Sequence, residues 1–193
     1  MALAHQPTLA DLLPAPAAPL GRLGRDALLV VAGSAIIAAC AQINVQVGVV
    51  PFTGSTLGVM LVAALLGSRR GVAAVLAYLL EGACGLPVFA GLSAGGAILM
   101  GTSGGYLVGF IPAAFVTGWL SERGWDRRLW TSCLAMVIGN ALVFAVGVPW
   151  LARFVGWEVA FQDGFLKFIP FDAGLKVLLA GAMLPLGWKL VRR

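Results

Sequence analysis

Long apolar runs separated by short clusters of basic residues constrain the fold of this chain more than any other feature. Of its 193 residues, 60% are hydrophobic and 11% are charged, whereas a soluble domain carries about 25% charged residues. An apolar run of about 20 residues can cross a bilayer as a helix, because a helix satisfies its own backbone hydrogen bonds where lipid offers none. We therefore expect an all-α membrane protein.

Six segments are predicted to cross the membrane. They are residues 27–47, 56–66 (extended from residue 52 onward to reach a spanning length), 72–85, 106–120, 129–151 and 169–190. Residues 153–167 are mixed and aromatic, which indicates a loop with an interfacial helix. Residues 1–25 contain the run PAPAAP, and so much proline prevents a helix. We expect a flexible cytoplasmic tail there and one six-helix transmembrane domain over residues 26–193.

The basic residues fall mostly on one side of this arrangement. Ten of the thirteen Lys and Arg residues occupy the tail, alternate linkers and the C-terminus, at Arg22, Arg25, Arg69, Arg70, Arg123, Arg127, Arg128, Lys189, Arg192 and Arg193. Basic residues favour the cytoplasmic side, so six helices with both termini in the cytoplasm are predicted. The net charge of +5 is scattered between apolar runs, which is typical of topology signals beside lipid headgroups and not of a nucleic-acid-binding surface.

The stretch 78–110 joins two apolar arms through a loop that has no charge. Residues 87–103 are rich in glycine, which has a high entropic cost of ordering. Irregular backbone at membrane depth is tolerated only where it is buried or lines a cavity. We expect this loop to be the lid or the wall of a pocket.

Three ionisable residues lie within the predicted spans, where each costs about 2.5–3.5 kcal/mol near the bilayer centre and tends to be functional. Asp172 and Lys176 are four residues apart and share a helix face. Either they face an interior pocket and offer a ligand an acceptor and a donor, or they pair with each other, or Asp172 caps the helix at the outer interface. Glu81 either neutralises Lys176 or binds ligand.

The first predicted span carries two further patterns. Gln42, Asn44 and Gln46 alternate near its far end, where they either point at a site or mark an interfacial helix end. Ala35 and Ala39 have the small-xxx-small spacing that lets another helix approach closely, within the protein or from a partner.

The sequence contains no constellation for catalysis or metal binding. The only histidine is His5, which excludes a histidine-based triad or zinc site in the spans. The GTSG run at 101–104 has the spelling used by intramembrane proteases, but its serine has no base. The three cysteines lie in apolar segments and match no metal motif. We expect no enzyme activity, no metal and no cofactor, and energy for any transport must come from an ion gradient or another subunit.

Several separated motifs resemble those of one family. They are YLLEGACGLPVFA at 78–90, GTSGGYLVGF at 101–110, VPFT at 50–53, TLG at 56–58, GNA at 139–141, GVPWLA at 147–152, and Pro170, Asp172 and Lys176. In this order, over nearly all the chain beyond the tail, they are similar to the BioY family, the biotin-binding S components of energy-coupling factor (ECF) transporters. The resemblance implies the six-helix S-component fold and a biotin site near the extracellular side, roofed by the first and third loops.

The resemblance also implies roles for particular residues. Asp172 and Lys176 correspond to the acid and base that bind the polar groups of biotin, together with the loop at 87–105. The remaining pocket residues implied are Tyr106 and the Gly104–Gly105 turn as the floor and Asn140 as a polar wall.

Partners follow from the same resemblance. It implies a helix surface that docks on a transmembrane coupling subunit, and we expect Ala35 and Ala39 in that surface. ABC-type ATPase subunits would use ATP, and the chain would be a multi-pass protein of the bacterial cytoplasmic (inner) membrane. The alternative is an ion-gradient-driven secondary transporter or a small oligomeric channel for another small molecule, which shares the topology and would move its ligand without other subunits.

Overall fold

The computed structural model describes residues 6–12, 18–46, 48–170, 174 and 176–191, without the side chains of residues 180, 190 and 191. Helices dominate it. The longer ones are α1 (Pro19–Ala41), α2 (Ser55–Leu66), α3 (Ser68–Ala83), α5 (Gly104–Ser121), α6 (Leu129–Val155) and α8 (Val177–Val191). The shorter ones are η1 (Leu9–Leu12), η2 (Ala90–Leu92), α4 (Gly96–Met100), η3 (Trp125–Arg127), α7 (Trp157–Phe161) and the π-helical η4 (Gln162–Leu166).

Three of the described helices, α1, α5 and α6, are long and apolar enough to be candidates to cross a membrane. α5 and α6 form the most extensive helix pair. Their close approach depends on Gly105, because a Cβ there would lie 2.2 Å from the Cβ of Trp150. Lipid provides little drive for helix association, so such close packing is what holds neighbouring helices together.

The predicted first span, residues 27–47, extends beyond the end of its helix. α1 begins at Pro19. Proline is favoured at the first position of a helix, because the N–H that it lacks would have no hydrogen-bond partner in the helix there. α1 ends at Ala41, and Asn44–Gln46 form a strand, β1, that pairs antiparallel with β2 (Pro51–Thr53). The alternation of polar residues with the β-branched Ile43 and Val45 suits a strand of period two better than a helix.

The other predicted segments agree better with the helices. α2, α5 and α6 contain the predicted segments 56–66, 106–120 and 129–151, and α3 overlaps 72–85. The interfacial helix expected within 153–167 is α7, followed by η4. Within the predicted tail, Leu9–Leu12 form η1. The division into a tail and one transmembrane domain stays a prediction.

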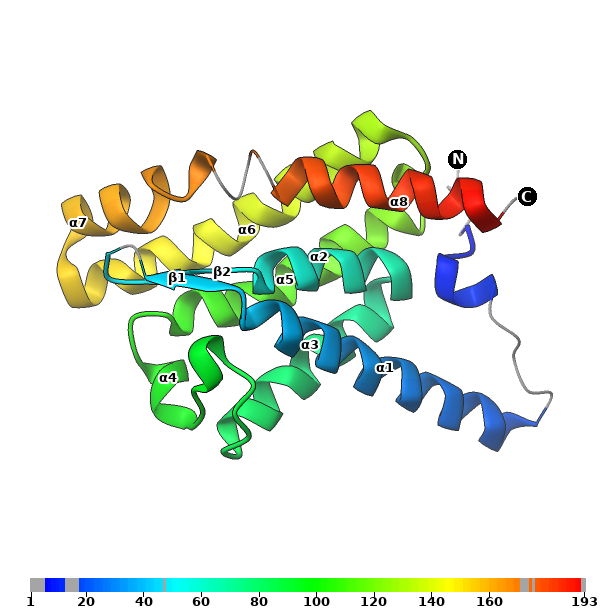
Figure 1. Ribbon diagram of the computed structural model, residues 1–193, viewed down its shortest axis with the longest axis horizontal. Helices are drawn as coiled ribbons and strands as arrows, with labels where there is room; N and C mark the ends of the chain where they lie inside the picture. The colour runs from blue at the N-terminus through cyan, green and yellow to red at the C-terminus, as the bar shows by residue number, and fades with distance from the viewer. Residues whose placement is uncertain (1–5, 13–17, 47, 171–173, 175, 192–193) are drawn as a thin grey trace.

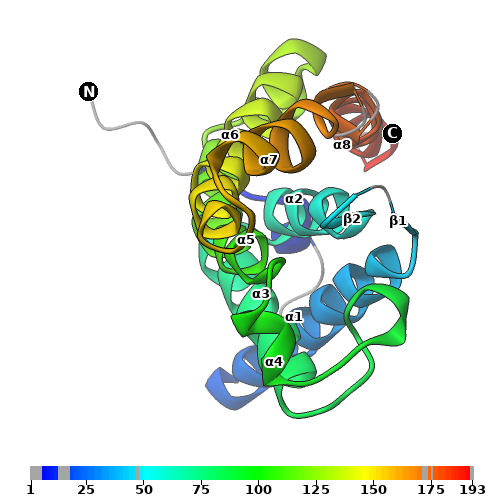
Figure 2. The same cartoon turned by 90° about the vertical axis from the view of Figure 1, so that its left-hand side faces the viewer.

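The connections gather at two ends of an elongated bundle (Figure 1). The β1–β2 hairpin, α4 and α7 lie at one end, which we call the hairpin end. η1, η3 and the C-terminal part of α8 lie at the opposite end, which we call the terminal end. Viewed along the long axis, α2 lies between α5 and the hairpin, with α1 and α4 on one side and α6, α7 and α8 on the other (Figure 2).

Candidate ligand-binding site

A cavity with an empty volume of about 680 Å³ lies between the hairpin, the helices and the loop 87–103, which we call the roof loop. Pockets for small organic ligands are mostly apolar with a few placed polar groups. The described residues that line this one are Val50, Pro51, Thr53, Ser55, Thr56, Tyr78, Phe89, Ala90, Ser93, Ile98, Ser103, Tyr106, Leu107, Phe110, Val143, Phe144 and Phe168. Among these described residues none is charged at neutral pH.

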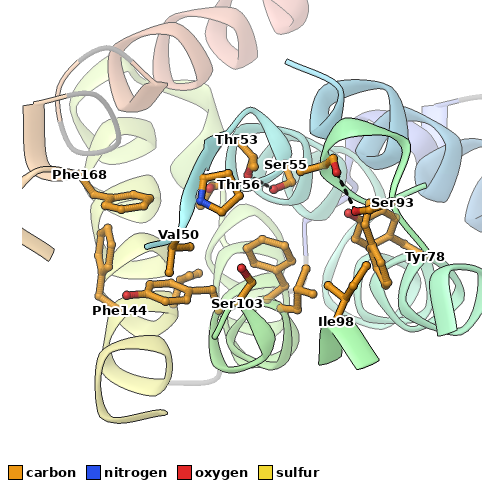
Figure 3. Close-up of a pocket in the computed structure, with 17 residues that line it drawn as sticks. Val50, Thr53, Ser55, Thr56, Tyr78, Ser93, Ile98, Ser103, Phe144 and Phe168 are labelled. Carbon is orange, nitrogen blue, oxygen red and sulfur yellow. Dashed lines mark hydrogen bonds between the residues drawn. The ribbon is translucent and has the colours of Figure 1, made fainter. Parts of the chain in front are cut away.

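Stacked aromatic rings form one wall of the cavity, shown beside Phe144 and Phe168 in Figure 3. Phe168 stacks on Phe52 of β2 with ring centroids 3.9 Å apart, and its ring is nearly parallel to that of Tyr106 at 6.1 Å. Tyr106 is fixed by its hydroxyl, which donates to the carbonyl of Gly164 at 2.9 Å. This buried hydrogen bond ties the start of α5 to η4 and sets the position of the wall.

Hydroxyl groups supply the polar part of the lining. Thr53 and Ser55 point toward each other near the top of Figure 3, with their hydroxyl oxygens 2.5 Å apart. Ser103, the residue before α5, also contributes its hydroxyl to the cavity lining (Figure 3). The cavity therefore combines apolar rings with neutral donors and acceptors, which suits a largely apolar ligand with a small polar head.

The roof loop closes the cavity opposite the aromatic wall. Its Phe89 is 2% exposed and meets the ring of Tyr78 edge-on at 5.4 Å. The ring packs directly on Gly82 of α3, where a Cβ would lie 2.1 Å from it. A larger residue at position 82 would push the roof off the cavity, which is a physical reason for the glycine in the EGACG run.

Of the predicted site residues, Tyr106 lines the cavity directly. Lys176 lies behind the lining, where its Nζ donates to the main-chain carbonyl of Thr53 at 2.5 Å. Asn140 is 4% exposed, one helical turn before the lining residues Val143 and Phe144. Within the described part of the chain its Oδ1 has no hydrogen-bond partner.

The remaining predicted site residues are placed as follows. Gly104 and Gly105 open α5 between the lining residues Ser103 and Tyr106, and their role as the floor stays a prediction. Glu81 accepts a hydrogen bond from Ser34 of α1 at 2.5 Å and joins α3 to α1 outside the cavity lining. Asp172 lies outside the described residues.

Sequence reasoning missed most of the aromatic lining. Phe89, Phe144 and Phe168 come from three separate segments, and none has a spacing that distinguishes it from an ordinary apolar residue. Only the uncharged composition of the roof loop gave a signal, and it correctly indicated a pocket wall.

Comparisons with known proteins agree on one family. The BioY family model matches residues 14–193. The probable biotin transporter BioY of Pyrococcus horikoshii is 39% identical over 145 residues, covering 75% of this chain and 85% of that protein. The biotin transporter BioY of Thermotoga maritima is 40% identical over 148 residues, covering 76% and 86%.

A solved structure shares the fold. The crystal structure of the S component for biotin from an ECF-type ABC transporter superposes with a TM-score of 0.74, at 23% sequence identity, over 92% of this chain and 96% of that one. With the family model covering nearly the whole sequence and relatives aligned over most of their length, this chain belongs to the BioY family.

Proposed function

We propose that this chain captures biotin and carries it into the cell as the substrate-binding S component of an ECF-type transporter. It is a transporter component and not an enzyme. The observation that carries the proposal is the cavity at the hairpin end. Its described lining is uncharged and combines aromatic rings with a few hydroxyls. The family of this chain includes proteins named as biotin transporters.

The chemistry of biotin fits this cavity. Its thioether ring is apolar and matches the wall of Phe168, Tyr106 and Phe144. Its ureido group offers two N–H donors and one acceptor, and it would face the hydroxyls of Thr53 and Ser55. Lys176, whose Nζ contacts the main-chain carbonyl of the lining residue Thr53, would donate to the ureido oxygen, while Asp172 would accept from the ureido N–H groups.

The same proposal gives the chain six membrane-crossing helices: α1, α2, α3, α5, α6 and α8. Basic residues are concentrated at the terminal end, including Arg70 and Arg127, whose contacts with Asp11 and Trp188 hold that end together. Because basic residues favour the cytoplasm, both termini would face inward and the cavity would open near the extracellular surface of a bacterial cytoplasmic membrane.

Transport would require a transmembrane coupling subunit and ABC-type ATPase subunits. The side chains of Ala35 and Ala39 are exposed on one face of α1, a face whose small residues let another helix approach closely. If this is the docking surface, Ala35→Trp abolishes assembly and uptake while biotin binding to the separate chain is unchanged. Normal assembly of that variant would remove Ala35 from the docking surface.

Biotin binding to the purified, detergent-solubilised chain tests the proposed function. We expect saturable one-to-one binding that weakens more than about tenfold in Lys176→Ala and in Asp172→Ala, because loss of a charged hydrogen-bond partner costs about 1.5–3 kcal/mol. Lys167→Ala is the matched control, since Lys167 is exposed and pairs with Asp163 outside the cavity lining. Absence of binding by a chain with intact helical circular dichroism would contradict biotin as the substrate.

A further inference from the structure

A single side-chain amide joins the end of α1 to the roof loop. Gln42 follows the last residue of α1 and is half-buried. Its Nε2 donates to the main-chain carbonyls of Val88 at 3.3 Å and Phe89 at 3.2 Å, and to Ala38 in its own helix at 3.1 Å. Its Oε1 accepts from the N–H of Leu92 at 2.9 Å. One side chain thus holds both ends of the short segment 88–92.

This attachment differs from the other attachments of the roof loop. Leu86 N–H, just before the loop, donates to Glu81 O at 3.0 Å, and Gly95 N–H, in its middle, donates to Gly82 O at 2.7 Å, both on α3. Further along, Gly101 O accepts from Trp150 Nε1 of α6 at 2.9 Å. Among the described residues, Gln42 makes every hydrogen bond that ties residues 88–92 to a helix of the bundle. The segment 86–95 is therefore attached to α3 on both sides of residues 88–92 and fastened to α1 through one side chain.

The fastened segment is strained. Leu92 has a φ of +57°, and it is the one residue other than glycine with a positive φ in the part of the chain that the structure describes. This conformation is unfavourable for a residue with a side chain and persists only where surrounding contacts impose it. The contact that reaches the Leu92 backbone is the hydrogen bond to Gln42. Its loss would let the backbone relax toward negative φ.

Relaxation of this segment would move the roof of the cavity. Phe89 and Ala90 lie within the fastened segment and line the cavity. Phe89 cannot leave its place between Tyr78 and Gly82 while its carbonyl is held by Gln42. A segment that is attached at two flanking points and fastened by one side chain between them can open without unfolding a helix, as lid loops do.

We propose that Gln42 is the latch of the cavity roof and sets the rate at which a bound ligand leaves. The residue positions the roof and does not itself line the cavity. The inference rests on the proposed function, because the ligand is taken to be biotin and the site to be the cavity described above. Mutations at binding sites change mainly the dissociation rate, so the latch should appear there rather than in the association rate.

Mobility of the loop tests the latch without any ligand. A nitroxide spin label is attached to Leu92→Cys, whose native side chain is 67% exposed, in a background with the three native cysteines replaced. We expect Gln42→Ala to raise the mobile fraction of the label's spectrum severalfold. Gln46→Ala is the control, since Gln46 is a nearby exposed amide in β1 whose Nε2 donates to the carbonyl of Gly48 and, among the described residues, makes no hydrogen bond to the roof loop. Equal spectra for the two variants would overturn the latch, whether or not the chain binds biotin.

Gln42→Glu separates the latch from a merely structural role. At neutral pH the carboxylate can still accept from the Leu92 N–H, but it has no N–H to donate and faces the carbonyls of Val88, Phe89 and Ala38, so the loop should be more mobile than in the native protein. Near pH 4 the carboxyl group is protonated and regains one donor, so mobility should fall toward that of the native protein. Mobility of this variant that does not change with pH would contradict donation from position 42 as the fastener.

Biotin dissociation from the same purified proteins completes the test. Loss of the hydrogen bonds of Gln42 should raise the dissociation rate at least about tenfold, with the association rate nearly unchanged, while Gln46→Ala dissociates like the native chain. A mobile loop with an unchanged dissociation rate would overturn Gln42 as the latch on the ligand. A mobile loop in a chain that never binds biotin would instead refute the proposed function and leave the fastening of the loop established.

Discussion

The two ends of this molecule each enclose a hollow, and the larger hollow is the one less suited to a ligand. The cavity at the hairpin end has an empty volume of about 680 Å³ and an uncharged described lining. The hollow at the terminal end measures about 1,180 Å³, and its described lining is Thr8, Asp11, Asp26, Leu66, Ser68, Arg69, Arg70, Phe115 and Glu122. Volume alone would select the terminal end.

Most of the charged groups that line the terminal hollow are held by bonds within the protein. Arg70 pairs with Asp11 at 2.7 Å and with Asp26 at 3.0 Å. Glu122 accepts from both the N–H and the hydroxyl of Ser68, at 2.7 and 2.8 Å. These bonds fasten the N-terminal segment and the start of α3 to the rest of the bundle, which is a structural role. The comparison teaches that a ligand-binding site is recognised by polar groups that are available to a ligand and not by the volume of the hollow.

Filling each hollow with the same side chain should give the largest difference between them. Ser103→Trp places an indole in the cavity at the hairpin end, and we expect biotin affinity to fall at least about a hundredfold because the ligand and the ring compete for one volume. Phe115→Trp enlarges a half-exposed residue that lines the terminal hollow and should leave affinity unchanged. Equilibrium binding measures both. Impaired binding in Phe115→Trp alone would reverse the assignment of the two ends.

Trp188→Phe should destabilise the terminal end without affecting the ligand. Trp188 Nε1 donates to the carboxylate of Asp126 at 2.6 Å, and Asp126 is 1% exposed. Burial raises the pKa of Asp126, and the hydrogen bond from Trp188 opposes that rise. Removal of the donor leaves a buried acceptor unsatisfied, at a cost of about 2 kcal/mol in the free energy of unfolding.

Thermal or chemical unfolding in detergent measures this effect, with biotin affinity recorded in parallel. Trp130→Phe is the matched control, because Trp130 is 85% exposed and its replacement should change stability little. Weaker biotin binding by folded Trp188→Phe would show that the two ends are coupled, contrary to the comparison.

The smallest expected effect is the pH dependence contributed by Asp11. Burial acts to raise its pKa, but hydrogen bonds from Arg70 and Thr8 outweigh burial and hold the pKa below its ordinary value. A depressed pKa in the folded state stabilises the protein above the unfolded pKa of about 3.9, and this contribution is lost as pH falls through the lower folded value.

Asp11→Asn isolates that contribution. At pH 7 we expect a loss of about 0.5 kcal/mol in the free energy of unfolding, since Asp11 is partly exposed and its ion pair is screened. As pH falls through the lowered pKa of folded Asp11, the variant and the native protein should converge. A difference that does not shrink as the pH is lowered would mean that Asp11 acts through packing and not through its charge. Biotin affinity should stay unchanged throughout.

Much of the helical framework and the family could be predicted from the sequence. Apolar runs bounded by glycine or basic residues located α2, α5 and α6, because the helix is the element that satisfies a backbone in lipid. The motifs indicated BioY, which the family comparison confirms. The end of the first span was wrong because a β-branched, alternating segment after Ala41 was counted as helix, although its period of two was visible.

The attachments of the roof loop and the ion pairs at the terminal end were decided only by the tertiary structure. Gln42 was noted in the sequence as a polar residue with two open interpretations, and only packing showed that it meets Leu92, fifty positions along the chain. Arg70 likewise meets Asp11 and Asp26 across connections whose course the sequence does not specify. Local composition determines where helices form, because their hydrogen bonds lie within a few residues. Contacts between distant segments depend on how those helices pack, and this is the physical reason why the cavity and its latch had to be seen in three dimensions.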